Sequence, residues 1–167
     1  MSDLPEYVVE RMFDAPRAMV WRAWTDPELL ARWYGPGVDT IIHKFDLKPG
    51  GVWLNEMQWG DKSDLSKAVF QEVVPEQRMV WHHSSTDADW NTVSNPMMAD
   101  WPRVLLTVVT FEDDGAKTKV TLTWTPLEAS EAEKACFANI MGNMGKGWES
   151  GFAIMDEMFA EMQAGES

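Results

Sequence analysis

The sequence of 167 residues is poor in several features, and each shortage excludes a class of protein. It has one cysteine, Cys136, so an internal disulfide framework cannot form. Lys and Arg number 14 against 27 Asp and Glu, and the resulting formal charge of −13 would repel nucleic acid or an anionic membrane. No apolar run approaches about 18 residues, and the N-terminal residues lack a basic start followed by an apolar stretch. We therefore expect a cytoplasmic protein that binds neither nucleic acid nor membranes.

Tryptophan and methionine are present in excess, with 10 and 12 copies. Tryptophan has the largest apolar surface of any side chain, and methionine adapts to irregular gaps. Such a composition is typical either of a tryptophan-rich core or of the walls of an apolar cavity. The length predicts one domain, residues 1–167, with a sizeable core.

Apolar periodicity predicts an alternation of strands and helices along the chain. Residues 7–13 alternate as a strand does, and Pro16 suits the first turn of a helix that follows. Asp26 is predicted to cap a second short helix over residues 28–33. Six further strands are predicted at residues 40–48, 52–59, 67–74, 79–83, 103–112 and 117–124.

The last part of the chain predicts one long helix. Ser130 and Glu133 form a capping-box pattern, and apolar residues then recur in steps of three and four until about Gln163. An antiparallel sheet with one apolar face needs such a helix to cover it. The prediction is therefore an α+β fold in which a curved seven-stranded antiparallel sheet, in the order β-α-α-β6-α, wraps on the C-terminal helix around a central cavity.

Residues 84–102 form a long polar segment that still carries Trp90 and Trp101. Long loops in compact domains are usually functional or disordered. The segment is either a loop packed on the domain or a lid or partner contact.

Two polar residues fall among apolar positions of the predicted sheet. Arg11 alternates with Tyr7, Val9 and Phe13, and a guanidinium there requires a partner. That partner is either an internal acid or the carboxylate of a ligand. His43 alternates with Phe45, which predicts a histidine on the inner face, either bonded to a neighbouring carbonyl or carboxylate or facing a ligand.

Catalytic and metal signatures are lacking in the sequence. No histidine stands at a metal-ligand spacing from Cys136 or another histidine, and His82 and His83 are expected to point to opposite faces of a strand. Cys136 has no histidine nearby in the sequence and no nucleophile elbow is present, so a buried structural thiol is expected. We predict no catalytic residue, no metal and no cofactor.

The remaining candidates are apolar side chains that face the predicted cavity from the sheet and from the long helix. Together with the two polar residues, the candidate ligand-binding set is Arg11, His43, Phe45, Trp53, Trp81, Phe111, Trp124, Met141, Met144, Trp148 and Phe152. A stripe of this kind is either solid core or a cavity wall.

Several stretches resemble a known superfamily, the START-like, birch-pollen-allergen-like (SRPBCC, helix-grip) proteins. Within it, the chain resembles the branch named after the activator of heat-shock-protein-90 ATPase. The stretches that carry the resemblance are residues 13–17 (FDAPR), 20–28 (VWRAWTDPE), 31–33 (ARW), 35–36 (GP), 46–51 (DLKPGG), 72–76 (EVVPE), 107–111 (TVVTF) and 147–148 (GW). The resemblance implies a helix-grip fold with a cavity that relatives use for hydrophobic ligands, for polyketide-type cyclisation or for docking on a chaperone.

Three functions remain open on these grounds. The first hypothesis is a binding protein for a small apolar or aromatic molecule, with Arg11 or His43 orienting its polar end. The second is a chaperone-associated interaction domain that acts through its surface. The third is a cavity enzyme of cyclase or hydrolase type, which we favour less because no catalytic pair can be named. The sequence does not decide between a monomer and a homodimer.

Overall fold

The three-dimensional arrangement comes from a computed structural model of the chain. It describes residues 6–34, 39–93, 101–127 and 129–165, with the side chains of all but residues 59, 141–148 and 165. The predicted α+β class and the order of its elements are confirmed. The elements are β1 (Tyr7–Phe13), α1 (Arg17–Thr25), α2 (Pro27–Trp33), β2 (Asp39–Phe45), β3 (Val52–Trp59), β4 (Lys62–Val74), β5 (Arg78–Ser85), β6 (Val104–Asp114), β7 (Lys117–Leu127) and α3 (Glu131–Gly165).

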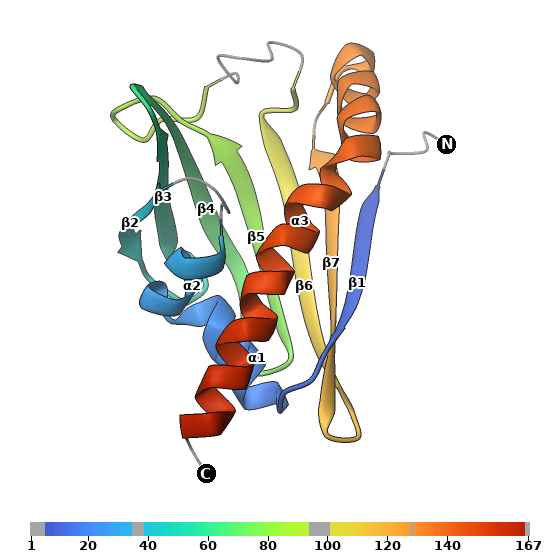
Figure 1. Cartoon of the computed structure of the whole chain (residues 1–167). Coiled ribbons are helices and arrows are strands. Elements are labelled where there is room, and N and C mark those ends of the chain that lie inside the picture. Colours follow the sequence, from blue (N-terminus) through green and yellow to red (C-terminus); the bar gives the residue numbers. More distant parts are fainter. Residues whose placement is uncertain (1–5, 35–38, 94–100, 128, 166–167) are drawn as a thin grey trace.

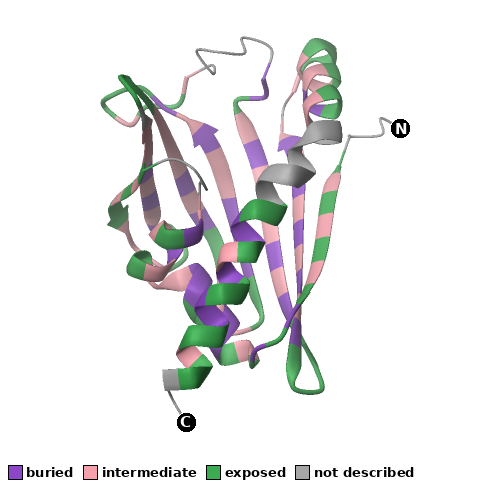
Figure 2. Ribbon diagram, viewed as in Figure 1, coloured by how far each residue is buried: buried purple, intermediate pink, exposed green. Residues whose placement is uncertain are grey.

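The strands form one antiparallel sheet of seven, in the order β1-β7-β6-β5-β4-β3-β2. The two strands that flank α1 and α2 in the sequence therefore lie at opposite edges, and the two short helices span the distance between them (Figure 1). Helix α3 crosses one face of the sheet, which we call the inner face (Figure 1). Burial alternates along the central strands as the sequence predicted (Figure 2).

The predicted helix caps are present. The Asp26 carboxylate accepts a hydrogen bond from the backbone N–H of Glu28 at 3.1 Å. Ser130 and Glu133 form a reciprocal capping box, in which each backbone N–H donates to the other side chain, at 2.8 and 3.2 Å. These bonds satisfy N–H groups that a helix start leaves without partners, which explains why both helices begin here.

A tight turn joins β2 to β3. Gly50 has a positive φ of 84°, which favours glycine, and a Cβ on Gly51 would collide with the backbone carbonyl of Asp46. The turn returns the chain so that Phe45 and Trp53 pair across the two strands on the inner face.

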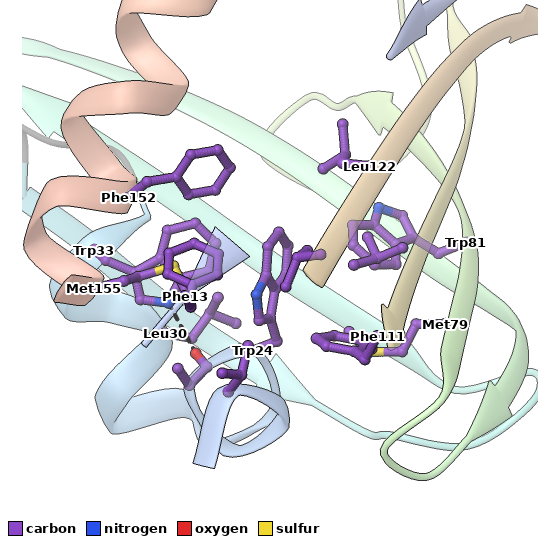
Figure 3. Close-up of a cluster of buried hydrophobic side chains, with 14 of the residues drawn as sticks. Phe13, Trp24, Leu30, Trp33, Met79, Trp81, Phe111, Leu122, Phe152 and Met155 are labelled. Carbon is purple, nitrogen blue, oxygen red and sulfur yellow. Dashed lines mark hydrogen bonds between the residues drawn. The ribbon is translucent and has the colours of Figure 1, made fainter. Parts of the chain in front are cut away.

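One part of the inner face is closely packed by helices. Phe13 contacts both Phe152 and Phe159 of α3 edge to face, with ring centroids 5.4 and 5.6 Å apart. Trp24 of α1 contacts Phe111 of β6 at 6.2 Å. Figure 3 shows Phe13, Trp24, Phe111 and Phe152 in a cluster of buried side chains that also includes Leu30, Trp33, Met79, Trp81, Leu122 and Met155. This packed cluster is the core of the protein.

Helix α3 is held against α2 by a close backbone approach. A Cβ on Gly151 would lie 3.0 Å from the carbonyl oxygen of Trp33, so the helix needs its smallest residue here. Glycine has no Cβ, and at Gly151 this allows the two backbones to approach closely. None of the described helices combines the length and apolar character needed to span a bilayer.

Candidate functional site

Polar side chains gather on a second part of the inner face. They are Trp53 and Asn55 of β3, Trp81 and His83 of β5, and Thr107 of β6, which we call the polar patch. Their proximity follows from register: Trp81 pairs with Thr107, while Ala68 pairs with both Trp53 and His83. The indole rings of Trp53 and Trp81 have centroids 5.9 Å apart. Three strands thus bring five polar side chains to one surface.

Most polar atoms of the patch have no hydrogen-bond partner. Asn55, Trp53, Trp81 and Thr107 are at most 3% exposed. Within the part of the chain that the structure describes, five of their atoms are shielded from solvent and unpaired: Trp53 Nε1, Asn55 Nδ2, Asn55 Oδ1, Trp81 Nε1 and Thr107 Oγ1. Buried polar groups in proteins are nearly always paired, so such a concentration needs an explanation.

The free energy involved is large. Each unpaired buried polar group costs about 1–3 kcal/mol. Four such side chains together approach the total stability of an ordinary domain, about 5–15 kcal/mol. A bound molecule that pairs with these groups recovers this free energy, so the patch is the best candidate for a binding site.

His83 supplies a neutral imidazole at the patch. Its ring stacks on Trp124 at 6.2 Å with an interplanar angle of 27°. Burial lowers the pKa of His83 from 6.5 to about 4, because the surroundings do not solvate the charged form. At neutral pH the ring therefore offers one donor and one acceptor and carries no charge.

The lowered pKa of His83 predicts a loss of stability in mild acid. In the unfolded chain the imidazole is protonated as the pH falls through 6.5, whereas the folded protein resists protonation until about pH 4. The unfolded state therefore binds the proton first. The contribution of His83 to the free energy of unfolding is fully present above pH 6.5 and is lost as the pH falls from 6.5 towards 4. We expect a loss of about 2–3 kcal/mol, measured by urea unfolding from pH 7.5 to 4.

The variant His83→Gln is expected to flatten this part of the pH profile. The matched control is His82→Gln, a change on the other face of the same strand, which leaves His83 in place and should keep the full drop. An identical drop in wild type and H83Q would show that another group causes it.

His43 does not face inward, and the prediction that it shares a face with Phe45 is wrong. The register of β2 on β3 shifts between Ile42 and Lys44, so a β-bulge inserts one extra residue and turns the His43 side chain to the outer face. There His43 Nε2 lies 2.7 Å from Glu56 Oε1. Hydrogen bonds from Gln58 and then from His43 lower the pKa of the Glu56 carboxyl. The neighbouring carboxylate is thus the partner of His43.

Arg11 lies on the inner face as predicted, at the edge strand β1. Its Nη2 donates to Asp156 Oδ2 at 2.7 Å, and its guanidinium carbon lies 5.2 and 5.6 Å from the ring centroids of Phe13 and Phe152. Of the two partners expected for Arg11, the internal acid is the one observed. A cleft of about 410 Å³ beside it is lined by charges of both signs, including Lys117 and Asp156.

The predicted apolar candidates divide into three groups. Trp53, Trp81 and Trp124 are buried and belong to or adjoin the polar patch, and Phe45 contacts Trp53 at 5.8 Å. Phe111 and Phe152 lie where α1 and α3 pack on the sheet, in the same hydrophobic core to which the three tryptophans also belong. The side chains of Met141, Met144 and Trp148 lie outside the described residues.

The segment 84–102 was expected to be either a loop packed on the domain or a lid or partner contact, and its two tryptophans lie in different places. Trp101 is 8% exposed and packs against Phe137 of α3 at 5.7 Å. Trp90 contacts the outward-facing His43 at 5.3 Å, and its carbonyl accepts a hydrogen bond from Lys67 at 3.1 Å. Trp90 therefore packs on the outer face and does not cover the polar patch.

Comparison with known proteins accounts for the architecture. The profile of the family described as "Activator of Hsp90 ATPase homolog 1-like protein" matches residues 14–160, which is most of the chain. The chain belongs to this family. No curated protein matches it significantly.

Solved structures of similar fold come from several bacteria. Protein Ms6760 from Mycobacterium smegmatis is 22% identical, with 94% of this chain and 95% of that one covered and a TM-score of 0.76. A protein from Arthrobacter aurescens is 21% identical, with coverage of 96% and 90% and a TM-score of 0.78. Protein NE0264 from Nitrosomonas europaea is 22% identical, with coverage of 98% and 99% and a TM-score of 0.72. At these identities the likeness establishes the fold alone.

Three residues of the polar patch were not predicted from the sequence. Asn55, His83 and Thr107 were not among the candidates. Asn55 and Thr107 each interrupt an inward-facing apolar series, as Thr107 does between Leu105 and Val109. That interruption was the available signal. No group of three or more His, Cys, Asp or Glu able to hold a metal occurs among the described residues.

Proposed function

We propose that this protein binds a small, largely apolar or aromatic molecule at the polar patch, on the face of the sheet that α3 crosses. The observation that carries the proposal is the set of unpaired, buried polar atoms of Trp53, Asn55, Trp81 and Thr107. Protein binding sites for small molecules combine apolar and aromatic walls with a few polar groups that fix orientation.

The surroundings of the patch supply the apolar walls. Trp53 contacts Tyr34 at 5.0 Å and Phe45 at 5.8 Å, and Trp81 contacts Phe70 at 6.0 Å. Aromatic rings of this kind bind flat apolar molecules by offset or edge-to-face packing. Because the polar atoms are shielded from solvent, a ligand reaches them only after covering side chains move aside, so binding is expected to be slow.

The test uses a variant that fills the site. Ala68 is 2% exposed and lies between Trp53 and His83, so Ala68→Leu places three more carbon atoms in the patch. We expect native mass spectrometry of the freshly purified wild type to show a small-molecule adduct, or a panel of uncharged aromatic compounds to raise its melting temperature. A68L should lose either effect.

The control for Ala68→Leu is Val69→Leu, because Val69 lies on the outer face of the same strand. This variant should keep the adduct and the thermal shift. A wild type that carries no adduct and responds to no compound would contradict the proposal, as would binding that A68L retains in full.

A further inference from the structure

The polar patch offers more hydrogen-bond donors than acceptors. The indole Nε1 of Trp53 and that of Trp81 each carry a hydrogen and have no lone pair able to accept. Both side chains are 3% exposed, and neither nitrogen has a partner among the described residues. Only a hydrogen-bond acceptor can satisfy them.

Further donors flank the two indoles, Asn55 beside Trp53 and Thr107 beside Trp81. Asn55 follows Trp53 by two positions on β3 and shares its face, and its amide adds two donors and one acceptor. Thr107 pairs directly with Trp81 across β5 and β6. Side chains related in these ways are about 5–7 Å apart at Cβ, so one functional group of a ligand can contact adjacent members of the patch, although Asn55 and Thr107 lie three strands apart at its two ends.

No positive charge stands among the described residues of the patch and their partners across the sheet. The described residues paired with it across the sheet are uncharged, namely Ile42, Phe45, Ser66, Ala68, Phe70, Leu105 and Trp124. His83 is neutral at physiological pH because burial lowers its pKa to about 4. Arg11 stands away from the patch on the edge strand β1, where its Nη2 is paired with Asp156 at 2.7 Å and its Nη1 is buried without a partner among the described residues.

A carboxylate bound at the patch would therefore lose its hydration without gaining a counter-ion. Burial of an unpaired charge is strongly unfavourable. A nearby acid adds to the effect: Asp64 lies farther along the inner face of β4, and burial raises the pKa of its carboxyl because the ionised form is poorly solvated there. The surroundings disfavour anions of any source.

We infer that the ligand presents an uncharged carbonyl oxygen, as in a ketone, quinone or amide on a flat apolar ring system, to the N–H groups of Trp53 and Trp81, whose rings lie 5.9 Å apart. This inference rests on the proposed function and specifies its ligand class. It assigns the two indole nitrogens to recognition of the ligand, and it excludes carboxylates of the same shape.

The test compares three naphthalenes substituted at the same ring position: an acetyl ketone, an ethyl compound of similar shape without an acceptor, and the carboxylate. Their dissociation constants for the full-length chain are measured by titration calorimetry at pH 7.5. We expect the ketone to bind about tenfold or more tightly than the ethyl compound, and the carboxylate to bind no better than the ethyl compound.

Two variants assign the preference to the indole nitrogens. Trp53→Phe and Trp81→Phe remove one N–H each and keep an aromatic ring, so each should reduce the ratio of ketone to ethyl affinity. The matched control is Trp24→Phe. Trp24 Nε1 is also buried and unpaired within the described chain, but it lies on α1 in the packed cluster, 4.6 Å from Trp33, so W24F should keep the ratio.

Each result has one meaning. Equal affinities for ketone and ethyl compound, tight binding of the carboxylate, or a ratio unchanged in both W53F and W81F would overturn carbonyl recognition and leave the proposed function standing. Failure of all three compounds to bind would overturn carbonyl recognition, and together with the lack of any adduct on the purified protein it would overturn the proposed function as well. Circular dichroism of each variant separates lost recognition from lost folding.

Discussion

Replacement of Trp33 by alanine is expected to lower the free energy of unfolding by about 4–5 kcal/mol. Trp33 is 1% exposed, and its ring contacts Trp24 at 4.6 Å and Phe152 at 6.5 Å. Its Nε1 donates a hydrogen bond of 2.8 Å to the carbonyl of Ala23. The alanine variant loses this packing, leaves a cavity and leaves the Ala23 carbonyl without its donor, and these losses act in the same direction.

The measurement is urea unfolding of W33A at pH 7.5, followed by circular dichroism. Trp33→Phe is the control, because it keeps most of the ring packing and loses the hydrogen bond, so its loss should be nearer 1–2 kcal/mol. A loss below about 1 kcal/mol in W33A would mean that the Trp33 side chain is not closely packed against Trp24 and Phe152 in the folded protein.

Trp33 matters beyond its own burial because it fixes helix α3. A Cβ on Gly151 would lie 3.0 Å from the backbone carbonyl oxygen of Trp33, so the backbones of α2 and α3 are in direct contact at this point. Arg32 of the same short helix reaches α3 as well, through an exposed contact of 3.1 Å with Glu161. The short helices thus determine how closely α3 lies on the sheet, and with it the space over the inner face.

Much of this fold follows from local sequence patterns. Alternation in β6 and β7 marked the inner face without error, because neither strand contains a bulge and both keep a period of two. The caps at Asp26 and Ser130 could be predicted because their chemistry is local, within three residues of each helix start. The family resemblance supplied the same architecture independently.

The position of His43 could not be obtained in this way. A single extra residue in β2 reverses the face of every side chain before it relative to those after it. Nothing in the stretch from Ile42 to Phe45 marks the bulge, because it depends on how β2 pairs with a partner strand that lies later in the chain.

Only Trp53 and Trp81 of the polar patch were predicted from the sequence, for a related reason. Trp53 and Trp81 were expected to form apolar walls, because the large apolar surface of tryptophan is its most evident property in a sequence. Whether an indole N–H or an amide such as that of Asn55 finds a partner depends on contacts between strands distant in sequence. Hydrogen bonding of buried polar atoms depends on tertiary structure, so the sequence predicted the two tryptophans of the inner face but not that their N–H groups lack partners.

Replacement of Asn55 by leucine is expected to stabilise the ligand-free protein by about 1–2 kcal/mol and to abolish ligand binding. The amide is 2% exposed, and neither Nδ2 nor Oδ1 has a partner among the described residues. Leucine has nearly the same size and branching, so it removes two unpaired polar atoms without opening a cavity. Urea unfolding without ligand measures the first effect, and the thermal shift with acetylnaphthalene measures the second.

The opposite signs of these two effects distinguish a binding residue from a structural one. Most substitutions of buried residues destabilise, whereas residues kept for binding are often replaced with a gain in stability and a loss of function. The control is Gln58→Leu on the same strand, whose amide donates to Glu56 Oε2 at 2.8 Å on the outer face and whose replacement should not stabilise. If N55L instead destabilised the protein by more than about 1 kcal/mol, the amide would have to be hydrogen-bonded in the folded chain. Asn55 would then stabilise the sheet and would not be a ligand-binding residue.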